Sequence, residues 1–142
     1  AASFNLDTWK NLALTYKHLE HLIDAFMPRT RRNNTYCKTL SGVSDERIKS
    51  VRTIDGLREV FNNDRYHKVN FEAYSRHRTV EFRQHSGTTN FTKMENWIRF
   101  LNGLITFAKR SSLPSRMTLE ELPFLDGKQK LFFKLRTKKL AV

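Results

Sequence analysis

The chain contains two stretches in which apolar residues recur every three or four positions, the spacing of a helix with one buried face. The first stretch predicts a helix over about residues 7–27, capped by Asp7 and ended by Pro28. The second predicts a helix over about residues 92–110, which Thr92 opens with a capping-box pattern. We expect both apolar stripes to lie in the core; they consist of Trp9, Leu12, Ala13, Tyr16, Leu19, Ile23 and Phe26, and of Met94, Trp97, Ile98, Leu101, Leu104, Ile105 and Ala108.

Two stretches between these helices alternate apolar and polar residues, which is the period of a β-strand. They cover residues 66–72 and 78–84, and the short link between them predicts an antiparallel hairpin. The face expected to be buried carries Val69, Phe71, Val80 and Phe82. The opposite face is polar and expected to be open, and it carries Lys68, Asn70, Glu81, Arg83 and His85. The same alternation is also typical of an ordinary half-exposed strand.

The remaining helical signals are shorter. Residues 41–50 include a short helical piece, and Thr53 is expected to cap a helix that runs to about Asn62. The sequence NND at residues 62–64 then predicts a turn. These elements and the hairpin predict an α+β fold, in which long helices pack on one face of a small antiparallel sheet.

The last part of the chain, residues 111–142, is interpreted as a basic helical tail that follows a domain of residues 1–110. Thr118 begins a short capped helix within it. The segment after Gly127 is amphipathic, and Leu131, Phe132 and Leu135 are expected to dock on the domain. A helix surrounded by solvent is the competing interpretation of this segment.

The charge of the chain is strongly positive, with 26 Lys and Arg residues against 14 Asp and Glu residues, a net charge of +12. Such a surface attracts polyanions, which include nucleic acids and nucleotide phosphates. The single cysteine, Cys37, excludes an internal disulfide and is expected to be a buried thiol rather than a nucleophile. No signal peptide and no apolar run of membrane-spanning length are visible, so we expect a cytoplasmic protein.

The charged residues on the open face of the hairpin are of the types that bind metal ions and phosphate. Glu81 and Arg83 share that face, and a second basic group, Arg31 and Arg32, lies on a polar loop. Carboxylates bind hard cations such as Mg²⁺, and guanidinium groups bind phosphate oxygens in pairs. A carboxylate that faces several guanidinium groups therefore suits a metal-bound polyphosphate, although Glu-x-Arg in a strand is also common as a simple ion pair.

Three segments of the chain carry a family resemblance: MPRTRRNNTYCKTL, RYHKVNFEAY and TVEFRQHSGTTNFTKMENWIRFLNGLITFA. In this order they resemble the phage- and plasmid-type amidoligases, which are similar to the carboxylate–amine ligases that include glutamine synthetase and glutamate–cysteine ligase. The resemblance covers roughly residues 5–110 and is most specific from Thr79 to Trp97. It implies an enzyme that uses ATP and Mg²⁺ to phosphorylate a carboxylate, after which an amine displaces the phosphate.

The resemblance also implies roles for single residues. Glu81 would be a metal ligand, and Arg83 would hold phosphate or the substrate carboxylate. Arg31 and Arg32 are similar to the basic loop that reaches the ATP phosphates. Asn70 and His85 would lie on the substrate side.

The chain departs from the family pattern at its beginning. Members of the family start with strands that carry Glu-x-Glu and His-x-His segments, and the present sequence starts after them. It is therefore similar to the C-terminal part of an amidoligase, and we expect it to lack full activity alone. Its partner would be the missing N-terminal segment or a second chain, which would pair with an open edge of the sheet.

Two other classes of function fit the same sequence. The net charge and the basic tail agree with a module that binds nucleic acid, although no known nucleic-acid-binding motif is present. The apolar surfaces agree with an interaction module that docks on a partner. Metal-dependent ATP binding would support the ligase, and a steep salt dependence of nucleic-acid binding would support the second class.

Overall fold

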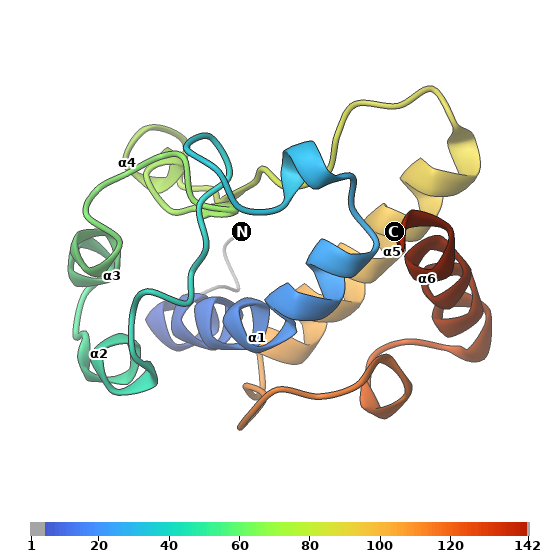
Figure 1. The fold of residues 1–142 in the computed structure, drawn as a ribbon. Helices are drawn as coiled ribbons and strands as arrows, with labels where there is room; N and C mark the ends of the chain where they lie inside the picture. The colour runs from blue at the N-terminus through green and yellow to red at the C-terminus, as the bar shows by residue number, and fades with distance from the viewer. Residues whose placement is uncertain (1–4, 142) are drawn as a thin grey trace.

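The computed structural model describes residues 5–141, apart from the side chains of residues 75 and 76. It is mostly helical, with one two-stranded antiparallel sheet, so the predicted α+β fold is confirmed. The long helices α1 and α5 pack against each other, and α6 lies beside the start of α5 (Figure 1). The elements are α1 Leu6–Ala25, η1 Arg29–Arg31, α2 Asp45–Ser50, α3 Ile54–Val60, β1 Val69–Asn70, α4 Ala73–His77, β2 Glu81–Phe82, α5 Phe91–Ala108, η2 Leu119–Glu121 and α6 Gly127–Leu140.

Helix α1 buries the whole apolar stripe that the sequence predicted, from Trp9 to Phe26. Its N-cap is Asn5 instead of the predicted Asp7, and the Asn5 side chain accepts a hydrogen bond from the Thr8 backbone at 3.0 Å. The helix begins one residue earlier than predicted, so Asp7 lies within its first turn. A carboxylate there interacts favourably with the positive end of the helix dipole.

Helix α5 begins at Phe91 and is capped by Asn90, which accepts a hydrogen bond from the Lys93 backbone at 3.1 Å. The prediction that Thr92 caps this helix was therefore wrong. The buried stripe is also rotated relative to the prediction, because Phe100 faces Phe26 at a ring distance of 5.9 Å. The stripe comprises Trp97, Phe100, Leu104 and Ala108, whereas Met94 and Ile98 are exposed.

The sheet pairs Val69 with Phe82 and Asn70 with Glu81, which confirms an antiparallel hairpin. Its strands are only two residues long, and helix α4 fills much of the connection between them. Arg78 ends α4 in the left-handed conformation, at φ 54°. The regular pairing is therefore much shorter than the predicted segments 66–72 and 78–84.

The polar face of β1 is covered, in contrast to the prediction of an open face. Lys68 is fully buried and Asn70 is 6% exposed. The chain around Lys38 runs alongside residues 66–68, directly before β1, and exchanges backbone hydrogen bonds with them. The Lys38 N–H donates to the Tyr66 carbonyl at 2.7 Å, and the Lys68 N–H donates to the Lys38 carbonyl at 3.0 Å. This neighbouring segment places Asn33 over the Lys68 side chain and removes it from solvent.

The short helices α2, α3 and η2 lie where the sequence predicted them, whereas η1 and α4 were not predicted. Thr53 caps α3 by accepting a hydrogen bond from the Gly56 backbone at 2.9 Å, and Asn62 and Asn63 have positive φ in the turn that follows. Thr118 forms the capping box of η2 with Glu121. None of the helices within residues 5–141 combines the length and the apolar character needed to cross a membrane.

Helix α6 docks through a face that differs from the predicted one. Phe133 is buried, with its ring 4.3 Å from that of Phe26 and 5.5 Å from that of Phe100. Phe132 packs against the core as predicted, whereas Leu131 and Leu135 are each 57% exposed, so the expectation that these two leucines dock was wrong. Residues 131 and 135 share the side of the helix opposite to Phe133, and one face alone can contact the body.

Candidate active site

The outer face of the hairpin carries the predicted pair of charged residues. The Arg83 guanidinium donates to Glu81 at 2.7 Å and lies 5.2 Å above the Tyr66 ring. The Glu81 side chain is 51% exposed. The Tyr66 ring in turn meets the exposed Tyr36 ring edge-on at 5.5 Å. A carboxylate, a guanidinium group and two aromatic rings therefore meet at one surface.

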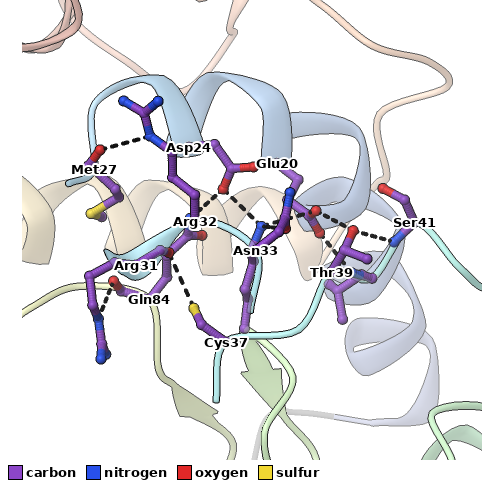
Figure 2. A network of polar contacts seen from close by, with 12 residues as sticks. Glu20, Asp24, Met27, Arg31, Arg32, Asn33, Cys37, Thr39, Ser41 and Gln84 are labelled. Atoms are coloured by element: carbon purple, nitrogen blue, oxygen red, sulfur yellow. Dashed lines mark hydrogen bonds and ion pairs between the residues drawn. The ribbon is translucent and has the colours of Figure 1, made fainter. Parts of the chain in front are cut away.

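The Arg31 side chain is hydrogen-bonded to the backbone that follows β2. Its Nε donates to the Gln84 carbonyl at 3.1 Å, and its Nη2 donates to the Arg83 carbonyl (Figure 2). The Arg83 Nε is buried and has no hydrogen-bond partner among the described residues. Arg31 therefore positions the end of the strand and adds positive charge behind Arg83.

Arg32 does not join this group. Its Nε donates to the Met27 carbonyl at 3.1 Å, at the end of α1. Figure 2 shows the Arg31 and Arg32 side chains leaving the loop in different directions. The sequence analysis grouped Arg31 and Arg32 as one basic loop, but in the structure the two side chains bind different parts of the chain.

Asn70 lies opposite Glu81 in the sheet and is thus beside the charged pair. Its Oδ1 accepts a hydrogen bond from the Glu72 backbone at 2.9 Å. This contact shapes the turn that leads from β1 to α4. The structure therefore brings Asn70, Glu81 and Arg83 together, with Arg31 attached to the following residues.

His85 lies apart from the charged pair and faces α5. Its ring stacks on that of Trp97 at 5.2 Å, and its Nδ1 is 2.7 Å from the Ser86 carbonyl oxygen. Burial lowers the pKa of His85, and the positive charges of Arg136, Lys93 and Arg31 lower it further, against the opposing effect of the Ser86 carbonyl. His85 belongs to a small cavity between α5 and α6.

A complete magnesium site is not formed by the residues described. Within residues 5–141, no three His, Cys, Asp or Glu side chains gather closely enough to hold a metal ion. Glu81 offers one carboxylate, already paired with Arg83. Mg²⁺ is usually held by one or two carboxylates together with substrate phosphates, so this donor set fits only part of such a site.

A buried polar network, which the sequence analysis did not predict, lies beneath the hairpin (Figure 2). The Lys68 ammonium lies 3.1 Å from Glu20 Oε2, 2.8 Å from Asp24 Oδ1 and 2.6 Å from Asn33 Oδ1. Glu20 and Asp24 are four residues apart on α1, between positions of the apolar stripe. That interruption of a buried helical face by two carboxylates is the signal that could have revealed the network.

The network continues to the chain after β2. Gln84 is fully buried, donates to Asp24 and accepts a hydrogen bond from the Tyr16 hydroxyl at 2.7 Å. On the other side, Glu20 accepts a hydrogen bond from the Leu40 backbone at 2.7 Å and another from the Thr39 hydroxyl. Burial raises the pKa of Tyr16 well above its ordinary value, which keeps its hydroxyl a donor. The network joins α1, the loop after it and the chain after β2 into one unit.

Cys37 is buried, as predicted, and its thiol donates to the Arg31 carbonyl at 3.2 Å. Burial raises its pKa, which disfavours the reactive thiolate. His18 and His21 contact different parts of the chain. His18 contacts Asp45 at 2.9 Å, and His21 contacts the Met117 carbonyl at 3.1 Å.

Residues 1–105 match the model of a family described as "Putative amidoligase enzyme". This match covers most of the chain and includes the hairpin, Arg31 and nearly all of α5. The chain therefore belongs to this amidoligase family. Comparison with curated proteins and with solved structures gave no match.

Proposed function

We propose that this chain forms part of an ATP- and Mg²⁺-dependent carboxylate–amine ligase. Membership of the amidoligase family supports a ligase, and the surface formed by Glu81 and Arg83 supports the use of a phosphorylated intermediate. In the proposed reaction, a carboxylate oxygen attacks the terminal phosphorus of ATP and ADP leaves. The amine nitrogen then attacks the acyl carbon, phosphate leaves and the amine loses a proton.

The observation that carries this proposal is the pairing of Glu81 with Arg83 beside the Tyr66 ring, with Arg31 attached behind it. Arg83 would hold a phosphate or the substrate carboxylate, since a guanidinium group donates to both oxygens of such a group. Glu81 would supply one carboxylate toward Mg²⁺. Arg32 and His85 lie away from this face, so we assign its positive charge to Arg83 and Arg31.

We also propose that the chain corresponds to the C-terminal part of a phage- or plasmid-type amidoligase. We propose that it acts in the cytoplasm. The sheet of two short strands supports the first point, because sheets that stand alone generally have three strands or more. The absence of a group of three metal-binding side chains around Glu81, among the described residues, supports it as well. The missing ligands and strands would come from an N-terminal segment or a second chain.

The test is calorimetric titration of Mg²⁺–ATP into the chain and into Glu81→Gln. We expect weak binding that requires magnesium and is reduced about tenfold in the variant, which corresponds to about 1.4 kcal/mol. Glu95→Gln is the matched control, because Glu95 forms an exposed ion pair with Arg99 at 2.8 Å on α5. Equal affinities in all three proteins, or binding without magnesium, would show that the hairpin is not a nucleotide site.

A second candidate function, the binding of nucleic acid, is favoured by one observation. The outer face of α6 carries four exposed lysines, and the 14 residues of this helix include no Asp or Glu. These lysines are Lys128, Lys134, Lys138 and Lys139. Such a face would bind phosphates without sequence preference.

A further inference from the structure

The start of α5 lies beside α6 (Figure 1). Residues of these two helices and of the loop before α5 line a small cavity. Its volume is about 100 Å³. The loop from His85 to Thr88 forms one wall, and apolar side chains form another.

The polar side of this cavity is positively charged. Lys93 reaches it from α5, Arg136 reaches it from α6, and His85 lies between the two helices. Of the described residues that line the cavity, none is an Asp or a Glu. Among the described residues, neither Lys93 nor Arg136 forms an ion pair. Two cations therefore line one partly open cavity, without an ion-pair partner among the described residues.

The surroundings strengthen the effect of these charges. Phe26, Phe132 and Phe133 form an apolar wall, and electrostatic interactions are stronger where water is excluded. The lowered pKa of His85 agrees with this, since burial is its largest cause and the charges of Arg136 and Lys93 add to it. An anion in the cavity would remove the repulsion between the cations.

The volume restricts what this anion can be. The cavity's volume of about 100 Å³ is larger than the space that one water molecule needs. Pockets for drug-sized ligands begin at about 300 Å³. A whole nucleotide is therefore too large, and a single small anionic group is the right size.

We propose that this cavity binds one phosphate group between Lys93 and Arg136. A phosphate carries a charge of about −1.5 to −2 at neutral pH, so it neutralises two cations, whereas a carboxylate neutralises one. The guanidinium of Arg136 is suited to donate to two phosphate oxygens. The hydroxyl-bearing residues Ser86 and Thr88 and the imidazole of His85 line the same space and offer further donors.

This site is independent of the proposed nucleotide site on the hairpin. Arg136 belongs to α6, which lies outside the residues that match the amidoligase family. The phosphate would be either the free ion or the end group of a small ester. Magnesium is not needed for this binding, because the charges in the cavity are already positive.

The first experiment is a calorimetric titration of inorganic phosphate into the whole chain, at constant ionic strength and without magnesium. We expect one site, weakened at least about tenfold in Arg136→Gln, as for the loss of a charge-assisted hydrogen bond. Arg47→Gln is the control, because it makes the same substitution at an exposed position on α2, away from the cavity and from α6. We expect its affinity to stay within about twofold of the original.

Equal weakening in Arg136→Gln and Arg47→Gln would overturn the proposal, because it would indicate diffuse attraction to the net positive charge of the protein. Absence of binding at millimolar phosphate would overturn it as well. The same titration with methyl phosphate identifies the source of the group: tighter binding of the ester indicates an end group, and tighter binding of inorganic phosphate indicates the free ion.

A second measurement uses the unaltered protein and does not depend on how a variant folds. The pKa of His85 is followed by NMR with and without inorganic phosphate. Phosphate in the cavity should raise this pKa, since an anion opposes the charges of Arg136 and Lys93. His77, exposed on α4, is the internal control. An unchanged His85 pKa, or an equal change at His77, would contradict binding in the cavity.

The magnesium–ATP titration tests the hairpin, and the magnesium-free phosphate titration tests the cavity. Each proposal can therefore fail while the other stands.

Discussion

Lys68 is the residue whose position departs most from the expectation of an open polar face. Its side chain is fully buried against Glu20 and Asp24 and also donates to Asn33. Burying three charged groups costs solvation free energy, which close pairing and the added hydrogen bonds offset. The alternating pattern correctly places the Lys68 and Val69 side chains on opposite faces of the strand. It does not indicate which segment of the chain covers each face.

We predict that Lys68→Met destabilises the protein by about 3–5 kcal/mol, because it leaves two carboxylates without their cation. Urea unfolding measures this change. Glu20→Gln should be strongly destabilising too, and the double variant should cost less than the sum of the two single changes.

The control for this prediction is Lys38→Met. Lys38 pairs with Asp64, but its side chain is 39% exposed, so its removal should cost no more than about 1 kcal/mol. Similar losses for Lys68→Met and Lys38→Met would show that burial does not set the strength of the Lys68 network.

At the scale of elements, local signals predicted helices better than strands. The caps Thr53 and Thr118 lie where the sequence placed them, because a cap depends on residues three positions apart. The phases of α5 and α6 were not predicted, since Phe100 and Phe133 face each other and Phe26 across elements distant in the chain. Helical periodicity alone does not choose between two adjacent apolar stripes.

The hairpin is attached to α3 by an ion pair that should make stability depend on pH. The Arg58 guanidinium donates to both oxygens of Glu72 at 2.9 Å. These hydrogen bonds are the largest cause of the lowered Glu72 pKa, which lies below its ordinary value of 4.5. The unfolded chain therefore holds this proton more tightly than the folded chain does.

We predict that the stabilisation from Glu72 is fully present above about pH 5 and is lost as the pH falls through the lowered pKa. Glu72→Gln should lower the free energy of unfolding by about 1–3 kcal/mol at pH 7 and flatten its fall below pH 5. Urea unfolding at a series of pH values measures both effects. A variant with the same acid slope as the unaltered protein would contradict this role of Glu72.

At the scale of the whole molecule, the excess of positive charge is unevenly distributed. Helix α6 contributes five lysines and one arginine and no carboxylate. If its outer face binds nucleic acid, the affinity should fall steeply with salt, by a slope of about 0.9 for each phosphate neutralised. This behaviour distinguishes a polyanion-binding module from a ligase that binds only a nucleotide.

We predict that replacing Lys134, Lys138 and Lys139 with Gln reduces the salt slope of duplex DNA binding by about 2–3 units. Fluorescence anisotropy at several salt concentrations measures the slope. The control replaces Arg47, Lys49 and Arg52, three exposed basic residues near α2, with Gln. Equal reductions in the two triple variants would mean that the net charge, and not α6, governs binding.

The sequence by itself determined the α+β class, the positions of most helices and the antiparallel pairing of the hairpin. It also placed Glu81 and Arg83 on one face, because the two-residue period of a strand is a local property. These features depend on residues close together in the chain, where spacing and backbone geometry are enough.

Only the tertiary structure decided what covers each face. It placed Asn33 and α1 over Lys68, directed Arg31 and Arg32 to different partners, and brought His85 close to Arg136. The physical reason is that burial and pairing of charge depend on contacts between segments up to about a hundred residues apart, as in the hydrogen bond from Leu113 to Thr15. Local periodicity contains no record of such contacts.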